Sequence, residues 1–350
     1  MGEWGLFWTA FGLTNVLFGA VTAAWLLRWQ DRLSLPAVPL AIVGAGLAPF
    51  VVTLVLYYGM MLLPGTSALA YVALVTGVML AVSLTAGEGW GRLAAMLRRI
   101  VRGASDPAMW PFWLGSLAVV VIAVLLLPNK PLVDHDVLEY GVQGRVFLRD
   151  KAIHFVRHRF DPATGFYYVG LHGFSFPLMF TWEGLVGEVV VAAGDGWSRS
   201  ITIWYAWLLI ALVWSLLRMA RPWLAVAGTL TMTLPLGFLF LLVVYHLDSY
   251  RIFLFSAVMA MLVAAFRSPS PARWLLLGTL AGAHAFVHSL GAILGGILVL
   301  VVVLANSGGI TERLRPVLWM IGPLLLAGGL HYVLDTFLGT GWIFKDIIWF

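Results

Sequence analysis

The chain has 350 residues, of which 61% are hydrophobic and 11% are charged, and it contains 17 tryptophans and no cysteine. So much apolar sequence exceeds what a soluble core requires, and apolar runs of about 18 residues predict a polytopic helical membrane protein, not a barrel of short alternating strands. The net charge of +5 is attributed to basic loop ends and not to nucleic-acid binding, and the lack of cysteine excludes disulfide and thiolate chemistry.

The apolar segments, taken in chain order, predict about ten membrane-spanning helices in an all-α fold. The N-terminal sequence "MGEWGLFWTAFG" has neither a basic region nor a cleavage site of small residues, so it is interpreted as part of the first span and not as a signal peptide. The predicted spans are 5–27, 37–63, 67–87, 111–128, 198–217, 223–245, 252–266, 274–289, 290–305 and 316–334.

A further apolar segment, 174–194, is interpreted differently because it contains Glu183 and Glu188. Each carboxylate would cost roughly 2.5–3.5 kcal/mol near the centre of a bilayer. We therefore expect this segment to form a pair of interfacial helices within one long extracytoplasmic loop, residues 129–197.

The distribution of charge supports this ten-span topology. The loops on one side contain 12 of the 21 basic residues and only four of the acids. The positive-inside rule assigns that side to the cytoplasm. If 174–194 crossed the membrane, the basic loops "RMAR" and "RSPSPAR" would both lie outside. We expect a multi-pass protein of the bacterial inner membrane whose active face is extracytoplasmic.

Titratable residues gather on the opposite, outer face. All eight histidines are predicted on or near that face, together with 12 of the 16 acids. Such a collection indicates a site, although the longest loop could simply hold the most polar residues. That alternative does not explain four residues that come from separate spans: His246, Asp248, His284 and His288.

The outer loop opens with the dense acidic sequence "VDHDVLEYGVQGR". The pattern of "HDVLEYGVQGRVFLRD" predicts a helix, on which Asp136 and Tyr140 would share a face. Asp134 would lie at or before the N-cap of this helix, where free N–H groups favour a carboxylate. It is therefore either a cap or a functional group.

The loop then becomes basic. The sequence "HFVRHRF" places Arg157 and Arg159 where they could bind phosphate oxygens, of a dedicated site or of general anionic head groups. Farther along the chain, His284 and His288 are predicted on one helical face near an outer end. This pair, like the two histidines of "HFVRHRF", could hold a metal. Without the glutamate of HExxH, each pair is more typical of satisfied histidines at a polar cavity.

These residues together resemble the GT-C class of membrane glycosyltransferases, in particular the bacterial relatives of protein O-mannosyltransferase and aminoarabinose transferase. In that class a span is followed by an outer loop that opens with Asp, with Tyr four and Arg nine residues on. A "PPL" segment, an Arg before the next span and an Asp at the outer end of a later span follow. The matching residues here are Asp136, Tyr140, Arg145, Pro177, Leu178, Arg199 and Asp248.

The resemblance divides the chain into three parts. Residues 111–334 would form the seven-span module of the class, 1–110 a three-span extension, and 335–350 an outer segment after which relatives continue. A longer chain or a partner membrane subunit would then supply the rest. Val137 stands where many relatives have Glu, and the Asp-His-Asp sequence before it is nearer the Asp-x-Asp of metal-using oligosaccharyltransferases. Metal dependence therefore stays open.

The resemblance also implies a reaction: a sugar moves from a polyprenyl-phosphate carrier in the lipid bilayer to an acceptor on the outer face. Asp136, supported by Asp134, would take the proton of the acceptor hydroxyl. The departing phosphate would need positive charge, from arginines or from Mn²⁺ or Mg²⁺ as cofactor. Substrate and phosphate would be bound by Tyr140, Arg145, Arg157, Arg159, His172 and Arg251. The ligands of such a metal would be Asp134, Asp136, Asp248 and His288.

Three other classes stay open. A lipid or solute transporter would hold polar residues near the bilayer midplane, often between inverted repeats, and the sequence shows no convincing sign of either. A metal-dependent membrane hydrolase or oxidase would use the histidine pairs. A non-catalytic scaffold in a larger membrane assembly would keep the GT-C-like module without its chemistry.

Overall fold

The structure is a computed structural model that describes residues 11–126, 135–153, 159–161, 166–168, 173–190, 196–233 and 248–337. Within these residues the fold is helical, as predicted, apart from one short antiparallel hairpin of β1 (Arg159–Asp161) and β2 (Phe166–Tyr168). Four of the six strand residues in this hairpin are aromatic, and aromatic side chains favour strands. The all-α prediction therefore needs this one addition.

The described residues form helices in the following order along the chain. They are η1 (Phe11–Leu17), α2 (Phe18–Arg28), α3 (Gln30–Leu33), α4 (Ala37–Gly46), α5 (Ala48–Leu62), α6 (Ala68–Ala86), α7 (Gly89–Arg102), η2 (Pro107–Met109), α8 (Trp110–Leu126), α9 (His135–Asp150), α10 (Ser175–Val190), α11 (Gly196–Ala220), α12 (Pro222–Thr233), α14 (Asp248–Arg267), α15 (Pro271–Val287), α16 (Ser289–Ala305), α17 (Ile310–Leu324), η4 (Leu325–Gly329) and α18 (Leu330–Phe337).

Five of the described helical segments are long and apolar enough to cross a membrane, and each coincides with a predicted span. They are Ala37–Leu62, Ala68–Ala86, Ile201–Ala220, Asp248–Arg267 and Ile310–Leu334. Two further predicted spans correspond to shorter apolar helices, Gly12–Arg28 and Ser289–Ala305. The other three contain α8, α12 and α15, and the residues that follow α8 and α12 lie outside the described part of the chain. The protein is therefore a helical membrane protein.

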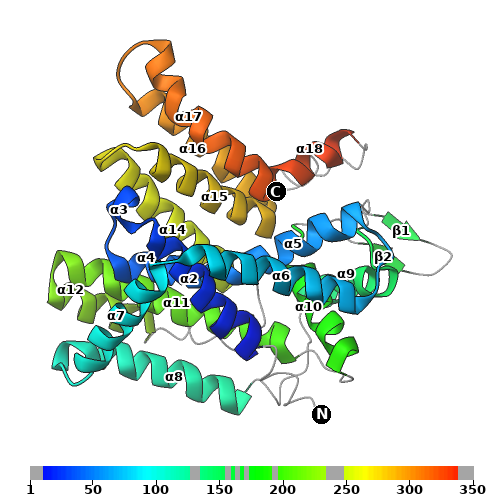
Figure 1. Ribbon diagram of the computed structural model, residues 1–350, viewed down its shortest axis with the longest axis horizontal. Coiled ribbons are helices and arrows are strands. Elements are labelled where there is room, and N and C mark those ends of the chain that lie inside the picture. The colour runs from blue at the N-terminus through cyan, green and yellow to red at the C-terminus, as the bar shows by residue number, and fades with distance from the viewer. Residues whose placement is uncertain are drawn as a thin grey trace.

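The ends of the helices gather in two groups at opposite ends of the molecule (Figure 1). The short helix α3 and the helix α12 lie at the left of the view, whereas α9, β1, β2 and α18 lie at the right. Between them, the core is rich in large aromatic side chains that solvent does not reach. The largest of these are Trp182, Tyr57, Tyr71, Tyr205 and Tyr250.

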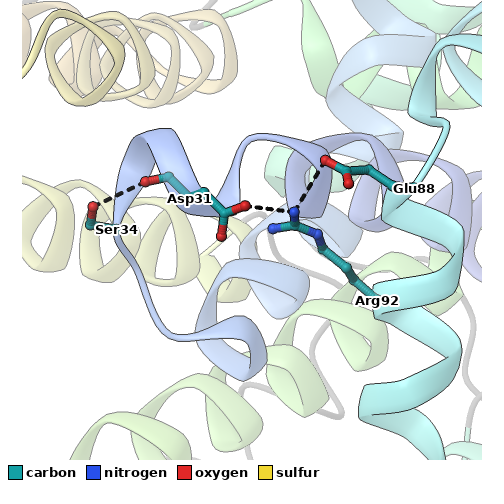
Figure 2. Close-up of polar contacts among 4 residues, drawn as sticks. All are labelled: Asp31, Ser34, Glu88 and Arg92. Atoms are coloured by element: carbon teal, nitrogen blue, oxygen red, sulfur yellow. Dashed lines mark hydrogen bonds and ion pairs between the residues drawn. The ribbon is translucent and has the colours of Figure 1, made fainter.

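One group of contacts joins α3 to α7 (Figure 2). The guanidinium Nη2 of Arg92 lies 2.6 Å from a carboxylate oxygen of Asp31 and 3.1 Å from one of Glu88. The hydroxyl of Ser34 donates to the backbone carbonyl of Asp31 at 3.0 Å. Loops that are distant in sequence therefore meet at this end of the bundle.

Acid should weaken this contact. The hydrogen bond from Arg92 lowers the pKa of Asp31 below its ordinary value of 3.8, so the contact is complete above that value and is lost as pH falls through the lowered pKa. The effect is small because the side chain of Asp31 is 80% exposed. We expect Asp31→Asn to lower the apparent Tm slightly at about pH 7 and not at all near pH 2. Parallel Tm curves for the two proteins across this range would contradict the assignment.

Arg273 makes a second set of contacts at this end. It is 5% exposed and donates to backbone carbonyls of Leu33 (2.6 Å), Ser34 (3.1 Å) and Ala264 (2.8 Å), as well as to that of Ser268. Its guanidinium thus satisfies carbonyls at the ends of α3 and α14, which would otherwise lack partners. One buried side chain holds three segments of the chain together.

At the opposite end of the molecule, Lys151, which follows α9, contacts both α10 and the turn between α5 and α6. Nζ of Lys151 lies 2.6 Å from a carboxylate oxygen of Glu188 in α10. The backbone carbonyl of Lys151 accepts from the N–H of Gly65 at 3.0 Å and from the hydroxyl of Tyr71 at 2.9 Å. The turn between α5 and α6 is therefore held against the outer segment.

The segment after residue 174 differs from its prediction. Over Ser175–Val190 it is one helix, α10, and not a pair of interfacial helices. Most of its side chains up to Gly187 are buried, and it packs against α5, α6 and α9. Glu183 is only 1% exposed, so its carboxylate lies in the protein interior and not in lipid. Protein packing around Glu183 therefore keeps this carboxylate out of contact with lipid.

Candidate functional site

Helix α9 carries the acidic sequence that opens the outer loop. It spans His135–Asp150, as the sequence predicts, and its backbone places Asp136 in the first turn. Tyr140, one turn later, is 4% exposed, and its ring meets that of Phe176 edge-on at 5.3 Å. Residues i and i+4 of a helix share a face, so the face of α9 that contains Asp136 and Tyr140 is the one directed towards α10. The side chain of Asp136 lies outside the described residues.

Glycine brings α9 and α10 into close contact. A Cβ atom at Gly144 would lie 2.5 Å from the carbonyl oxygen of Pro177 and 2.6 Å from the Cβ of Phe180. The hydroxyl of Thr181 donates to the carbonyl of Gly144 at 3.0 Å. The two helices can approach this closely only because residue 144 has no side chain. The segment that begins with Asp136 is therefore fixed against the "FPL" segment.

This contact predicts opposite effects for two glycines on the same helix. Gly144→Ala should destabilise the protein by about 1–3 kcal/mol, because the added methyl group overpacks the interface. Gly141→Ala should be neutral or slightly stabilising, because its Cβ would meet only the ring of Phe180, at 3.7 Å, and alanine favours helix. Thermal unfolding of the purified variants measures both, and equal Tm values would contradict the packing described.

Arg145 is separated from Asp136 by the geometry of α9. Nine residues turn a helix through about two and a half turns and advance it by about 13.5 Å. Positions 136 and 145 of the backbone therefore lie on opposite faces of α9, and the side chain of Arg145 is exposed. Arg145 makes no ion pair with any other described residue. Its predicted role beside Asp136 gains no support from the structure.

The start of α10 lies against the outer end of α15. A Cβ at Gly173 would be 2.5 Å from the carbonyl oxygen of Val287. The ring of Phe174 is stacked at 6.4 Å from Phe286 and lies edge-on, 5.0 Å, to the ring of His331 in α18. His331 is 2% exposed. The outer loop and the ends of α15 and α18 thus form one packed group of aromatic side chains.

The start of α14 adds charged groups at the same end. Asp248 and Arg251 form an ion pair, with 2.9 Å between Oδ1 and Nη1, and both are partly exposed. The ring of His284 in α15 lies 6.4 Å from that of Phe255, one turn after Arg251 on α14. We call Asp248, Arg251 and His284, together with α9, the outer site.

His288 does not continue the helical face of His284. Helix α15 ends at Val287, and His288 has extended backbone angles (φ −159°, ψ 149°). Its Nδ1 accepts from the N–H of Leu290 at 3.1 Å, so it caps α16. The prediction that the two histidines share a face is wrong, because α15 ends at Val287, two residues before the predicted end of that span, and the chain reverses at His288.

Two of the four predicted metal ligands, Asp248 and His288, have partners within the described residues. The carboxylate of Asp248 is paired with the guanidinium of Arg251, and a positive charge there repels a divalent cation. Nδ1 of His288 is engaged by a backbone N–H. Within the described part of the chain, no three His, Asp or Glu residues are grouped as metal ligands. The other two predicted ligands, Asp134 and the side chain of Asp136, lie outside it.

Several other predicted residues also lie outside the described part. Asp134, Arg157 and His172 are among them, as are the other two histidines of "HFVRHRF" and His246. Arg159 is placed only as a backbone position of β1, and Arg199 only as one of α11. The basic cluster therefore stays a prediction.

The structure also reveals residues that the sequence interpretation missed. Gly144, Thr181 and Phe174 position the outer segment although none carries a chemical motif. The two glycines of "GVQGR", three residues apart in an otherwise helical segment, were the available signal, because glycine within a helix often marks a close approach.

Comparison with known proteins does not extend this description. The chain matches no protein-family model, no curated protein and no solved structure.

Proposed function

We propose that the protein is a glycosyltransferase that moves a sugar from a polyprenyl-phosphate carrier to an acceptor on the outer face of a bacterial inner membrane. The observation that carries this proposal is the close packing of α9 on α10 through Gly144 and Pro177. It joins the two outer segments that resemble the GT-C class and sets both beside the ends of α14, α15 and α18.

Asp136 is the base in this proposal. Its carboxylate takes the proton of the acceptor hydroxyl while the acceptor oxygen bonds to the anomeric carbon of the sugar. The bond from that carbon to the phosphate oxygen breaks, and its electron pair leaves with the polyprenyl phosphate. Asp136 belongs to the first turn of α9, where the helix dipole stabilises a negative charge.

Arg251 is the cation that we assign to the phosphate. It is fixed by its ion pair with Asp248 yet keeps part of its surface exposed, and arginine N–H groups match phosphate oxygens in geometry. This assignment replaces Arg145, which faces away from Asp136. Because a guanidinium supplies the positive charge, the proposed reaction uses no metal.

The proposed topology has ten spans with the outer site on the extracytoplasmic side. Contacts between distant segments support it, because they join ends that the ten-span topology puts on one side. Arg92 and Arg273 bind α3 to α7 and α14, and Arg218 of α11 lies 3.3 Å from Asp106. Lys151 joins the outer segment to the turn at Gly65.

A direct test of the function is sugar transfer in membranes. Membranes containing the full chain, and matched membranes without it, are incubated with a panel of radiolabelled polyprenyl-phosphate sugars, with and without EDTA. We expect label transfer that requires the chain and resists EDTA. Loss of transfer in EDTA would overturn the metal-independent mechanism. No transfer with any donor, in folded protein, would favour a scaffold or a transporter.

A further inference from the structure

A cavity of about 740 Å³ opens between α4, α11, α14 and α15. Its walls are almost entirely apolar and include Leu212, Leu216, Met219 and Val263. Its polar lining comes mainly from the turns at one end, which contribute Ser34, Arg267, Ser268 and Arg273. This is the end of the bundle where α3 and α12 lie, opposite the outer site (Figure 1).

The cavity is about as deep as one leaflet of a bilayer. Along α14 its lining extends from Ser256 to Arg267. Eleven residues of α-helix measure about 16 Å, and half of a bilayer's hydrocarbon core is about 15 Å. An apolar space of this depth, with polar side chains at one end, matches one acyl chain.

Positive charge without a counter-ion lies at the polar end. Arg267 is exposed in the last turn of α14 and forms no ion pair with another described residue. Arg273 is 5% exposed and its hydrogen bonds go to backbone carbonyls, which are neutral. A buried charge needs a partner of opposite sign, and the described residues supply no carboxylate to either arginine.

We propose that this cavity binds one anionic phospholipid, with an acyl chain between α11 and α14 and the phosphate at Arg267 beside Arg273. The lipid neutralises both arginines and covers the apolar walls. Basic pockets between membrane helices on the cytoplasmic side are suited to anionic head groups. This site is separate from the outer site and does not depend on the proposed glycosyltransferase activity.

The test uses the purified full chain in a neutral detergent. Phosphatidylglycerol and phosphatidylcholine with identical acyl chains are titrated separately, and bound lipid is counted by native mass spectrometry. Four variants are compared with the wild type: Arg267→Gln, Ala260→Phe in the cavity wall, and the controls Arg98→Gln and Ile252→Phe, whose side chains lie outside the cavity. Inorganic phosphate alone forms a further arm.

We expect one phosphatidylglycerol to bind about fivefold more tightly than phosphatidylcholine. Arg267→Gln should abolish this preference, Ala260→Phe should prevent binding of both lipids, and the controls should behave as the wild type. Three results would overturn the proposal: equal binding of both lipids to the wild type, loss of lipid in the controls to the same extent, or displacement of the lipid by inorganic phosphate. A dimer that Ala260→Phe disrupts, with no bound lipid, would instead assign the cavity to a second copy of the chain.

Discussion

Asp136→Asn is expected to lower sugar transfer by about 10²–10⁴-fold, the usual contribution of a general base. The amide keeps the size of the side chain and its place in the first turn of α9, but it cannot accept the proton of the acceptor hydroxyl. Binding of the lipid-linked donor should change little, so the loss should appear in kcat more than in KM. The assay is label transfer in membranes with matched protein levels.

Asp150→Asn provides the matched control. It makes the same chemical change on the same helix, about 21 Å along the axis, where Asp150 pairs with its exposed neighbour Arg149. Transfer by this variant should stay within about twofold of the wild type, since an ion pair with an exposed partner such as Arg149 contributes little. Equal transfer by Asp136→Asn and the wild type would contradict the proposed role of Asp136 as the base. An equal loss in both variants would point to the stability of α9 instead.

Arg273→Met is expected to cause the largest loss of stability, about 3 kcal/mol. Each buried carbonyl that loses its partner costs about 1–3 kcal/mol, and Arg273 serves carbonyls at the ends of two helices. Water reaches some of these groups after the change, so the total falls below the full sum. An apparent Tm about 5 °C lower is the expected result.

Two further variants separate the effect of the guanidinium geometry of Arg273 from the effect of its positive charge. Arg273→Lys keeps the positive charge, but one ammonium group cannot reach carbonyls on both sides as a planar guanidinium does. It should therefore recover less than half of the lost stability. Arg98→Met, which removes an exposed arginine of α7, should leave the Tm unchanged. A Tm for Arg273→Met equal to that of Arg98→Met would show that the contacts of Arg273 are not needed.

The class of the protein and the bounds of several helices follow from local sequence. Apolar runs long enough to cross a bilayer predicted five segments that the structure forms as helices of sufficient length and hydropathy to do so. The apolar spacing of "HDVLEYGVQGRVFLRD" predicted α9 from its first residue to its last. Both features depend on neighbours a few residues apart, so one chain without relatives is enough to find them.

The contacts between helices do not follow from local sequence, because they join segments that are distant along the chain. The sequence pattern continued through His288, but the chain reverses there because its side chain caps the next helix. The sequence pattern also favoured an interfacial position for residues 174–194, because the carboxylate of Glu183 is unfavourable in lipid. Packing against α5, α6 and α9 instead encloses that carboxylate within the protein.

The sequence by itself determined a helical membrane protein with an acidic helix at the head of a long loop. The tertiary structure decided that Gly144 allows that helix to contact α10, that Arg273 binds separate turns, and that an apolar cavity ends at Arg267. The physical reason is the separation along the sequence of the residues that interact. Helix formation is governed by residues within a few turns, whereas close packing and buried hydrogen bonds depend on segments that only the folded chain brings together.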